Sequence, residues 1–239
     1  MKMTVYVEGQ SEMLFVADVL QKYSHYDPSE CGFHCINLVA DCRSKISYPV
    51  QGDFDSAKFY QIINANCDTQ VNSRLKKDAA ALVAKGYDMV VGLRDVYGDE
   101  YKCLTSDRIV YYDKIDQLHK FQTAAINHSG VNCRLHYAVM EFEAWMLALI
   151  ENYIVSKGFE PAEVLGKRDI AADCEPELIY HPYPLIQKIF EDCGASYHKH
   201  QGDTYSFLST LGKDDYERLR RSGRCPSFTL FMNSLLGEA

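Results

Sequence analysis

The feature that most constrains the fold is the alternation of short apolar runs with segments of helical periodicity. Residues 3–7 form an apolar run of strand length, and from Ser11 the apolar residues recur at helical spacing. Further strand-like runs occur at 33–39, 87–93 and 133–140, and further helical segments at 71–85 and 112–127. This alternation predicts an α/β fold with a mostly parallel sheet flanked by helices.

The sequence changes character after Gly158, where prolines and acidic residues interrupt the pattern and short helical segments follow. No long linker rich in glycine or serine precedes these segments. We therefore expect an α/β domain over residues 1–158 and a smaller helical C-terminal region over residues 159–239, packed on the core.

Charge and hydropathy limit the class of protein. The net charge is −8, which argues against an independent, non-specific nucleic-acid binder, because such proteins are usually basic. It leaves open a nuclease that reaches phosphates through metal ions. No apolar stretch approaches the roughly 18 residues that span a bilayer, and the N-terminus lacks a signal-peptide pattern. We therefore expect a cytoplasmic protein without a membrane anchor.

The nine cysteines are an odd number scattered along the chain, which argues against a disulfide framework. The tightest group, Cys31, His34, Cys35 and Cys42, lacks the paired C-x₂-C spacing typical of zinc sites. A zinc site is therefore not favoured.

Acidic residues follow three of the predicted strands: Glu8 after the first, Asp95 after the third, and Glu141 with Glu143 after the last. Ligands of parallel sheets bind beyond the carboxyl ends of the strands, so these side chains can converge. Clustered carboxylates repel one another unless a cation lies among them, and hard oxygen ligands suit Mg²⁺ or Mn²⁺. The pattern predicts a site for metal-assisted phosphoryl transfer.

Each acid also has a simpler interpretation, as a solvated turn residue or a charge favoured at a helix N-terminus. Asp99 can add a further ligand, but it follows Gly98 and can equally decorate a turn. Glu141 and Glu143 are two residues apart on a predicted helix, so we expect only one of them to reach a metal directly. Arg94 can contact a phosphate or form a structural ion pair.

The segment "VYVEGQSEMLFV" resembles the opening of the TOPRIM fold of DnaG-type primases, topoisomerases and overcoming-lysogenization-defect nucleases. "VEGQSE", "LRDVYGDE", "MEFEAWMLA", "YHKHQGDTY" and "RCPSFTLFMNSLL" resemble, in this order, the bacterial TOPRIM-like family catalogued as domain of unknown function 4276. This resemblance covers nearly the whole chain and implies a TOPRIM-like, mostly parallel sheet.

The resemblance also implies roles for individual residues. Glu8 matches the TOPRIM glutamate, which acts as general base or acid or joins the metal shell, and Asp95 matches the first acid of the Asp-x-Asp element. Val96 and Tyr97 follow Asp95, so the second acid is missing, although Asp99 can substitute for it from the loop. Lys199, in the family-like "YHK" segment, is the preferred substrate contact.

The leading hypothesis is a metal-dependent phosphodiesterase or nuclease that acts on nucleic acid. Gene context in the resembling family implies an ATPase partner in phage defence or repair. The alternative is a non-catalytic TOPRIM-like module that docks on an ATPase, which the missing acid favours. A nucleotide-binding regulator is disfavoured because neither a P-loop nor a G-x-G-x-x-G pattern occurs.

Overall fold

A computed structural model describes residues 1–38, 48–105, 107–126, 132–171 and 173–238. The chain forms two compact units. The first comprises Met1–Arg94, Asp116–Tyr137 and Asn233–Ala239, and the second comprises Asp95–Ile115 and Ala138–Met232. This division by packing differs from the change of sequence character after Gly158, and the domain boundary drawn there stays a prediction.

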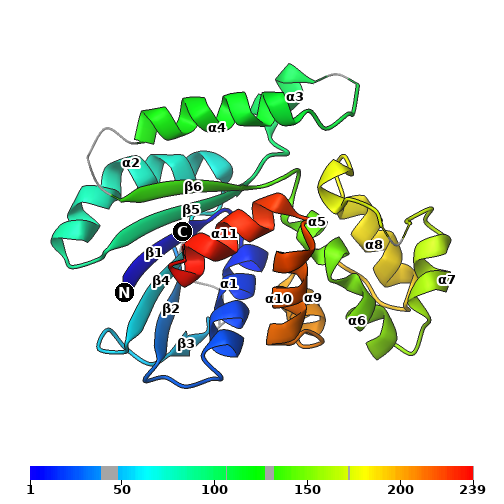
Figure 1. Cartoon of the computed structure of the whole chain (residues 1–239), viewed down its shortest axis with the longest axis horizontal. Coiled ribbons are helices and arrows are strands. Elements are labelled where there is room, and N and C mark those ends of the chain that lie inside the picture. The colour runs from blue at the N-terminus through cyan, green and yellow to red at the C-terminus, as the bar shows by residue number, and fades with distance from the viewer. Residues whose placement is uncertain (39–47, 106, 127–131, 172, 239) are drawn as a thin grey trace. The chain divides into compact units, whose positions relative to one another are not determined.

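The first unit is built on a six-stranded sheet with the strand order β3-β2-β4-β1-β5-β6 (Figure 1). The strands are β1 (Lys2–Val7), β2 (Cys31–Asn37), β3 (Val50–Gln51), β4 (Lys58–Asn64), β5 (Met89–Asp95) and β6 (Cys133–Ala138). β1 pairs in parallel with β4 and β5, β2 pairs in parallel with β4, and only the short β3 is seen to run antiparallel, against β2. The predicted mostly parallel α/β sheet is confirmed.

Helices cover both faces of this sheet. In Figure 1, α1 (Gln10–Tyr23) lies on one face, and α2 (Asp68–Ala84) and α4 (Tyr112–Ile126) lie on the other. The central strand β1 is therefore apolar and almost fully buried. A Cβ atom at Gly92 of β5 would lie 2.6 Å from the side chain of Leu75, so a glycine permits the close approach of α2 to the sheet.

β4 is absent from the strands that the sequence predicts, although it lies between β1 and β2 and pairs with both. Its sequence, "KFYQIIN", begins with the exposed Lys58 and is interrupted by the half-buried Gln61. These polar residues break the apolar run, so neither a continuous nor a cleanly alternating pattern signals the strand.

The second unit is mainly helical, which agrees with the helical C-terminal segments predicted from the sequence. Its helices are α3 (Asp99–Leu104), α5 (Phe142–Ala148), α6 (Ile150–Ser156), α7 (Pro161–Gly166), the 3₁₀ helix η2 (Pro176–Leu178), α8 (Tyr183–Asp192), α9 (Gln201–Leu208), α10 (Lys213–Ser222) and most of α11 (Pro226–Leu236). Trp145 of α5 is fully buried and packs against Phe228 and Phe231 of α11.

None of the helices in the described residues combines the length and the apolar character that crossing a membrane requires.

Candidate metal centre

Asp95 and Glu141 come together because two neighbouring strand ends continue side by side. Beyond β5 and β6, the backbone N–H of Val96 donates to the carbonyl of Ala138 at 3.1 Å, and that of Tyr97 to Met140 at 2.7 Å. The backbone N–H of Phe142, the first residue of α5, then donates to Asp95 Oδ1 at 2.9 Å. The end of β5 is thereby tied to the start of α5.

Three carboxylates meet at this point. Asp95, Glu141 and Glu143 each offer one oxygen atom, and these atoms all lie within 4.8 Å of one another. All three residues are buried, with exposed fractions of 9%, 6% and 0%. The convergence predicted for Asp95 with the two glutamates is therefore present within the second unit.

Both glutamates reach the three-acid group, although residues two apart on a regular helix point to different sides; that only one of them contacts a metal directly stays a prediction. Glu141 is the N-cap of α5, with an extended backbone at φ −148° and ψ 159°, while Glu143 lies in the first helical turn. The side-chain directions of a regular helix therefore do not apply to Glu141, and the two carboxylates can point to one place.

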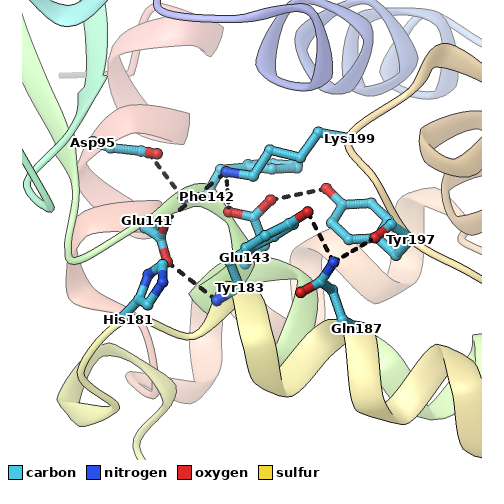
Figure 2. A network of polar contacts seen from close by, with 9 residues as sticks. All are labelled: Asp95, Glu141, Phe142, Glu143, His181, Tyr183, Gln187, Tyr197 and Lys199. Carbon is cyan, nitrogen blue, oxygen red and sulfur yellow. Dashed lines mark hydrogen bonds and ion pairs between the residues drawn. The ribbon is translucent and has the colours of Figure 1, made fainter.

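Groups from the first residue of α8 and from the segments that precede α8 and α9 contact the two glutamates (Figure 2). Lys199 Nζ lies 2.9 Å from Glu143 Oε2 and 3.9 Å from Glu141 Oε1. The Tyr197 hydroxyl donates to Glu143 Oε1 at 2.9 Å. The outer oxygen of Glu141, Oε2, lies 2.8 Å from His181 Nδ1 and accepts a hydrogen bond of 3.1 Å from the backbone N–H of Tyr183.

Opposing electrostatic effects act on the buried Glu143. Burial raises the pKa of Glu143, the ammonium of Lys199 acts in the opposite direction, and the neighbouring Glu141 raises it further. When the acids are ionised, the ammonium of Lys199 lies against Glu143 and Glu141. A further cation would therefore stabilise the ionised cluster.

The donor set fits a hard divalent cation. Mg²⁺ binds oxygen at about 2.1 Å, so two ligands on opposite sides of it are about 4.2 Å apart. Oxygens in neighbouring octahedral positions are only about 3 Å apart, so the three oxygens, which all lie within 4.8 Å of one another, would move closer together around one ion. Carboxylates alone suit Mg²⁺, Mn²⁺ or Ca²⁺ better than softer transition metals.

Three other residues named from the sequence are not members of the three-acid group found among the described residues. Glu8 is half-buried, follows β1 and belongs to the first unit. Asp99 is exposed in the first turn of α3 and is not part of the three-acid group found among the described residues. Arg94 is buried, with Nη2 2.8 Å from Asp68 Oδ2 and Nη1 donating to Gln122, so it forms a structural ion pair. Catalytic, ligand and substrate roles for these three stay predictions.

Tyr97 lies two residues after Asp95. Its ring stacks on the imidazole of His181, with centroids 4.2 Å apart and planes inclined by 11°. Lys102 Nζ lies 4.1 Å from the centroid of the same ring. Tyr97 therefore supports the histidine that contacts Glu141 instead of providing a carboxylate.

His181, Tyr183 and Tyr197 were not among the predicted site residues. The only local signal is the helix start at "HPYP", because proline in the first turn marks an N-terminus whose backbone N–H groups can donate outward. Met140, His181 and Lys199 also have positive φ values, of 62°, 53° and 58°. Such strained residues gather at functional sites more often than elsewhere.

The cysteine group considered for zinc has an unfavourable setting. Cys31 and Cys35 are buried in β2, and burial raises the pKa of their thiols to about 11 and about 12. A zinc ligand must be a thiolate, which these values disfavour. Cys42 lies outside the described residues.

Comparison with known proteins gives a family and no further relative. No curated protein and no solved structure matches the chain significantly. Residues 7–236 match the family model described as "Domain of unknown function (DUF4276)". Because this match covers almost the entire chain, the protein belongs to the DUF4276 family.

Proposed function

We propose that this protein is a metal-dependent phosphodiesterase or nuclease of TOPRIM type, in which Asp95, Glu141 and Glu143 hold Mg²⁺ or Mn²⁺. The observation that carries the proposal is the convergence of three buried carboxylate oxygens within 4.8 Å. A divalent ion bound there would neutralise charge on a phosphate and lower the pKa of a water molecule. Nucleic acid as substrate, an ATPase as partner and the cytoplasm as compartment belong to the proposal.

Other residues of the chain are proposed to bind phosphate, to transfer a proton or to add metal ligands. Lys199 supplies a positive charge beside the acids and is the proposed phosphate contact. Glu8 is the proposed general base or acid, or a further metal ligand. Asp99 is a proposed auxiliary ligand from α3, and Arg94 a proposed second phosphate contact.

The direct test measures Mn²⁺ binding by isothermal titration calorimetry and cleavage of DNA and RNA in Mg²⁺ or Mn²⁺. We expect Asp95→Asn and Glu143→Gln to weaken Mn²⁺ binding at least tenfold and to abolish cleavage, because each removes a ligand charge from the cluster. Glu151→Gln, at an exposed acid of α6, is the matched control and should behave as the wild type. Folded Asp95→Asn and Glu143→Gln proteins that bind Mn²⁺ and cleave normally would refute the assignment.

The same two measurements separate the roles proposed for Glu8. If Glu8 transfers a proton, Glu8→Gln loses cleavage and keeps its Mn²⁺ affinity. If Glu8 belongs to the metal shell, Glu8→Gln loses both. Retention of both in Glu8→Gln removes this residue from the proposed site.

A second candidate function is a non-catalytic module that docks on an ATPase. The observation that favours it is Tyr97, whose ring packs on His181 where the Asp-x-Asp element would have its second acid. Stable co-purification of an ATPase, together with the absence of cleavage under every metal condition, would select this function. Metal-dependent cleavage that the Asp95→Asn substitution abolishes would reject it.

A further inference from the structure

The ammonium of Lys199 lies against the same carboxylates that a divalent cation would need. We propose that Lys199 is a displaceable counter-ion of the acidic cluster: a divalent metal takes its place at Glu141 and Glu143, and the released ammonium then binds an anionic oxygen of a phosphate group. Metal and phosphate therefore bind in order, with the metal first. This inference rests on the proposed function and adds to it the way in which the metal controls substrate binding.

Each of the two glutamates has one oxygen held by other donors and one oxygen that faces Lys199. Glu143 Oε1 is held by the hydroxyl of Tyr197, and Glu141 Oε2 is held by the backbone N–H of Tyr183 and lies beside His181. The other two oxygens, Glu143 Oε2 and Glu141 Oε1, are the ones that face Lys199, at 2.9 Å and 3.9 Å (Figure 2). Exchange of the ammonium for a metal thus leaves the donors on the outer oxygens in place.

An ammonium and a divalent ion cannot share these two oxygens. A metal bound about 2.1 Å from Glu143 Oε2 would lie within a few ångströms of an ammonium that stayed 2.9 Å from the same atom. Two positive charges at that distance repel each other strongly in a buried site. Lys199 therefore competes with the metal as long as it remains on the acids.

The side chain of Lys199 is partly exposed and can move toward solvent when a metal displaces it. Its side chain is 36% exposed, whereas those of Glu141 and Glu143 are 8% and 0% exposed, so the lysine lies at the open side of the cluster. Its Nζ is also 4.9 Å from the centroid of the Tyr183 ring, a cation–π contact that it makes while it lies on the carboxylates. A four-carbon stem lets the ammonium turn to a phosphate beside the metal.

The test compares Lys199→Met, Lys199→Arg and the wild type as full-length chains, with Mn²⁺ and inorganic phosphate as probes in calorimetric titrations at fixed pH and ionic strength. We expect Lys199→Met to bind Mn²⁺ at least tenfold more tightly than the wild type, because the competing charge is gone. Lys199→Arg should stay within threefold of the wild type. Lys167→Met, which removes an exposed charge at the end of α7, controls for net charge and should leave Mn²⁺ affinity unchanged.

The phosphate titrations test the order of binding. Wild-type protein should bind phosphate at least tenfold more tightly with Mn²⁺ than without it, and Lys199→Met loaded with Mn²⁺ should lose that gain. The inference is overturned if Lys199→Met binds Mn²⁺ no more tightly than the wild type. It is also overturned if phosphate affinity of the wild type does not depend on Mn²⁺. Thermal melts of each variant confirm that it is folded, and if Lys199→Met is not folded, the phosphate titrations of the wild type with and without Mn²⁺ still test the inference.

Failure of this inference can be told apart from failure of the proposed function. If Glu143→Gln abolishes Mn²⁺ binding and Lys199→Met leaves it unchanged, the metal centre stands and only the displacement of Lys199 is wrong. If neither the wild type nor Lys199→Met binds Mn²⁺, both proposals fail. The cluster is then a purely structural ion-pair network.

Discussion

Glu177 and Glu143 are both completely buried in the second unit, but their surroundings differ. Glu177 Oε1 accepts hydrogen bonds from the backbone N–H of Ser227 at 3.1 Å and from its hydroxyl at 2.6 Å. The same hydroxyl accepts a bond of 3.0 Å from the indole N–H of Trp145. Glu143 instead lies beside two other acids and one ammonium.

The comparison distinguishes Glu177, a buried acid with a structural role, from Glu143, a member of a candidate metal-binding cluster. Burial raises the pKa of both carboxyls, but in Glu177 neutral donors on Ser227 act against the shift, whereas in Glu143 a lysine acts against it and a second carboxylate adds to it. A single acid satisfied by neutral donors needs no further charge. Three acids that meet beside one ammonium form a cluster that a divalent cation would stabilise.

The largest expected difference between the two glutamates is their effect on stabilisation by metal. At about one hundred times its dissociation constant, Mn²⁺ should raise the free energy of unfolding of the wild type and of Glu177→Gln by about 2.7 kcal/mol. Glu143→Gln should lose most of this gain because a ligand charge is missing. Urea unfolding with and without Mn²⁺ measures the difference. An equal gain in both variants would show that Glu143 contributes no more to metal binding than Glu177 does.

Truncation of Glu177 should cost stability without metal. Glu177→Ala leaves the N–H and hydroxyl of Ser227 without their acceptor, so we expect a loss of about 1–3 kcal/mol in the free energy of unfolding. Glu177→Gln retains an acceptor oxygen and should lose less. Urea unfolding without added metal checks both variants. A Glu177→Ala protein as stable as the wild type would show that the buried network contributes little.

The smallest expected effect is on the pH dependence of stability. The folded-state pKa of Glu177 lies above its ordinary value of 4.5 because burial disfavours the charged form. Relative to Glu177→Gln, the wild type should therefore be most stable below about pH 4.5 and should lose this advantage as the pH rises through the folded-state pKa. Unfolding free energies of the two proteins at about pH 4, 5.5 and 7.5 give the difference, and a constant difference contradicts the shift.

The fold was largely predictable because strands that are buried on both faces appear in the sequence as apolar runs. After Lys2, β1 is mostly apolar and almost fully buried, and a charge and a glycine follow it, so its limits are visible in the sequence. β4 carries Lys58 and Gln61, and its position at the side of β1 comes from long-range pairing that local periodicity does not encode.

The site was predictable only in part. Asp95 and Glu141 could be paired because parallel strands end at one edge of a sheet. The contact of His181 with Glu141 joins residues 40 positions apart, and no local pattern reports such a pair. Glu141 and Glu143 approach the same point because Glu141 is the N-cap of α5 and has an extended backbone. An argument from helical spacing treats Glu141 as part of the helix and so misplaces its side chain.

The hydrogen bond from Phe142 to Asp95 Oδ1 has a consequence for coordination number. With one oxygen of Asp95 held by the start of α5, one of Glu143 held by Tyr197 and one of Glu141 held by Tyr183, each acid would act as a monodentate ligand. An octahedral Mg²⁺ has about six positions, so about three would stay open to water and to a substrate. The tie between β5 and α5 thus favours an unsaturated ion over a fully caged one.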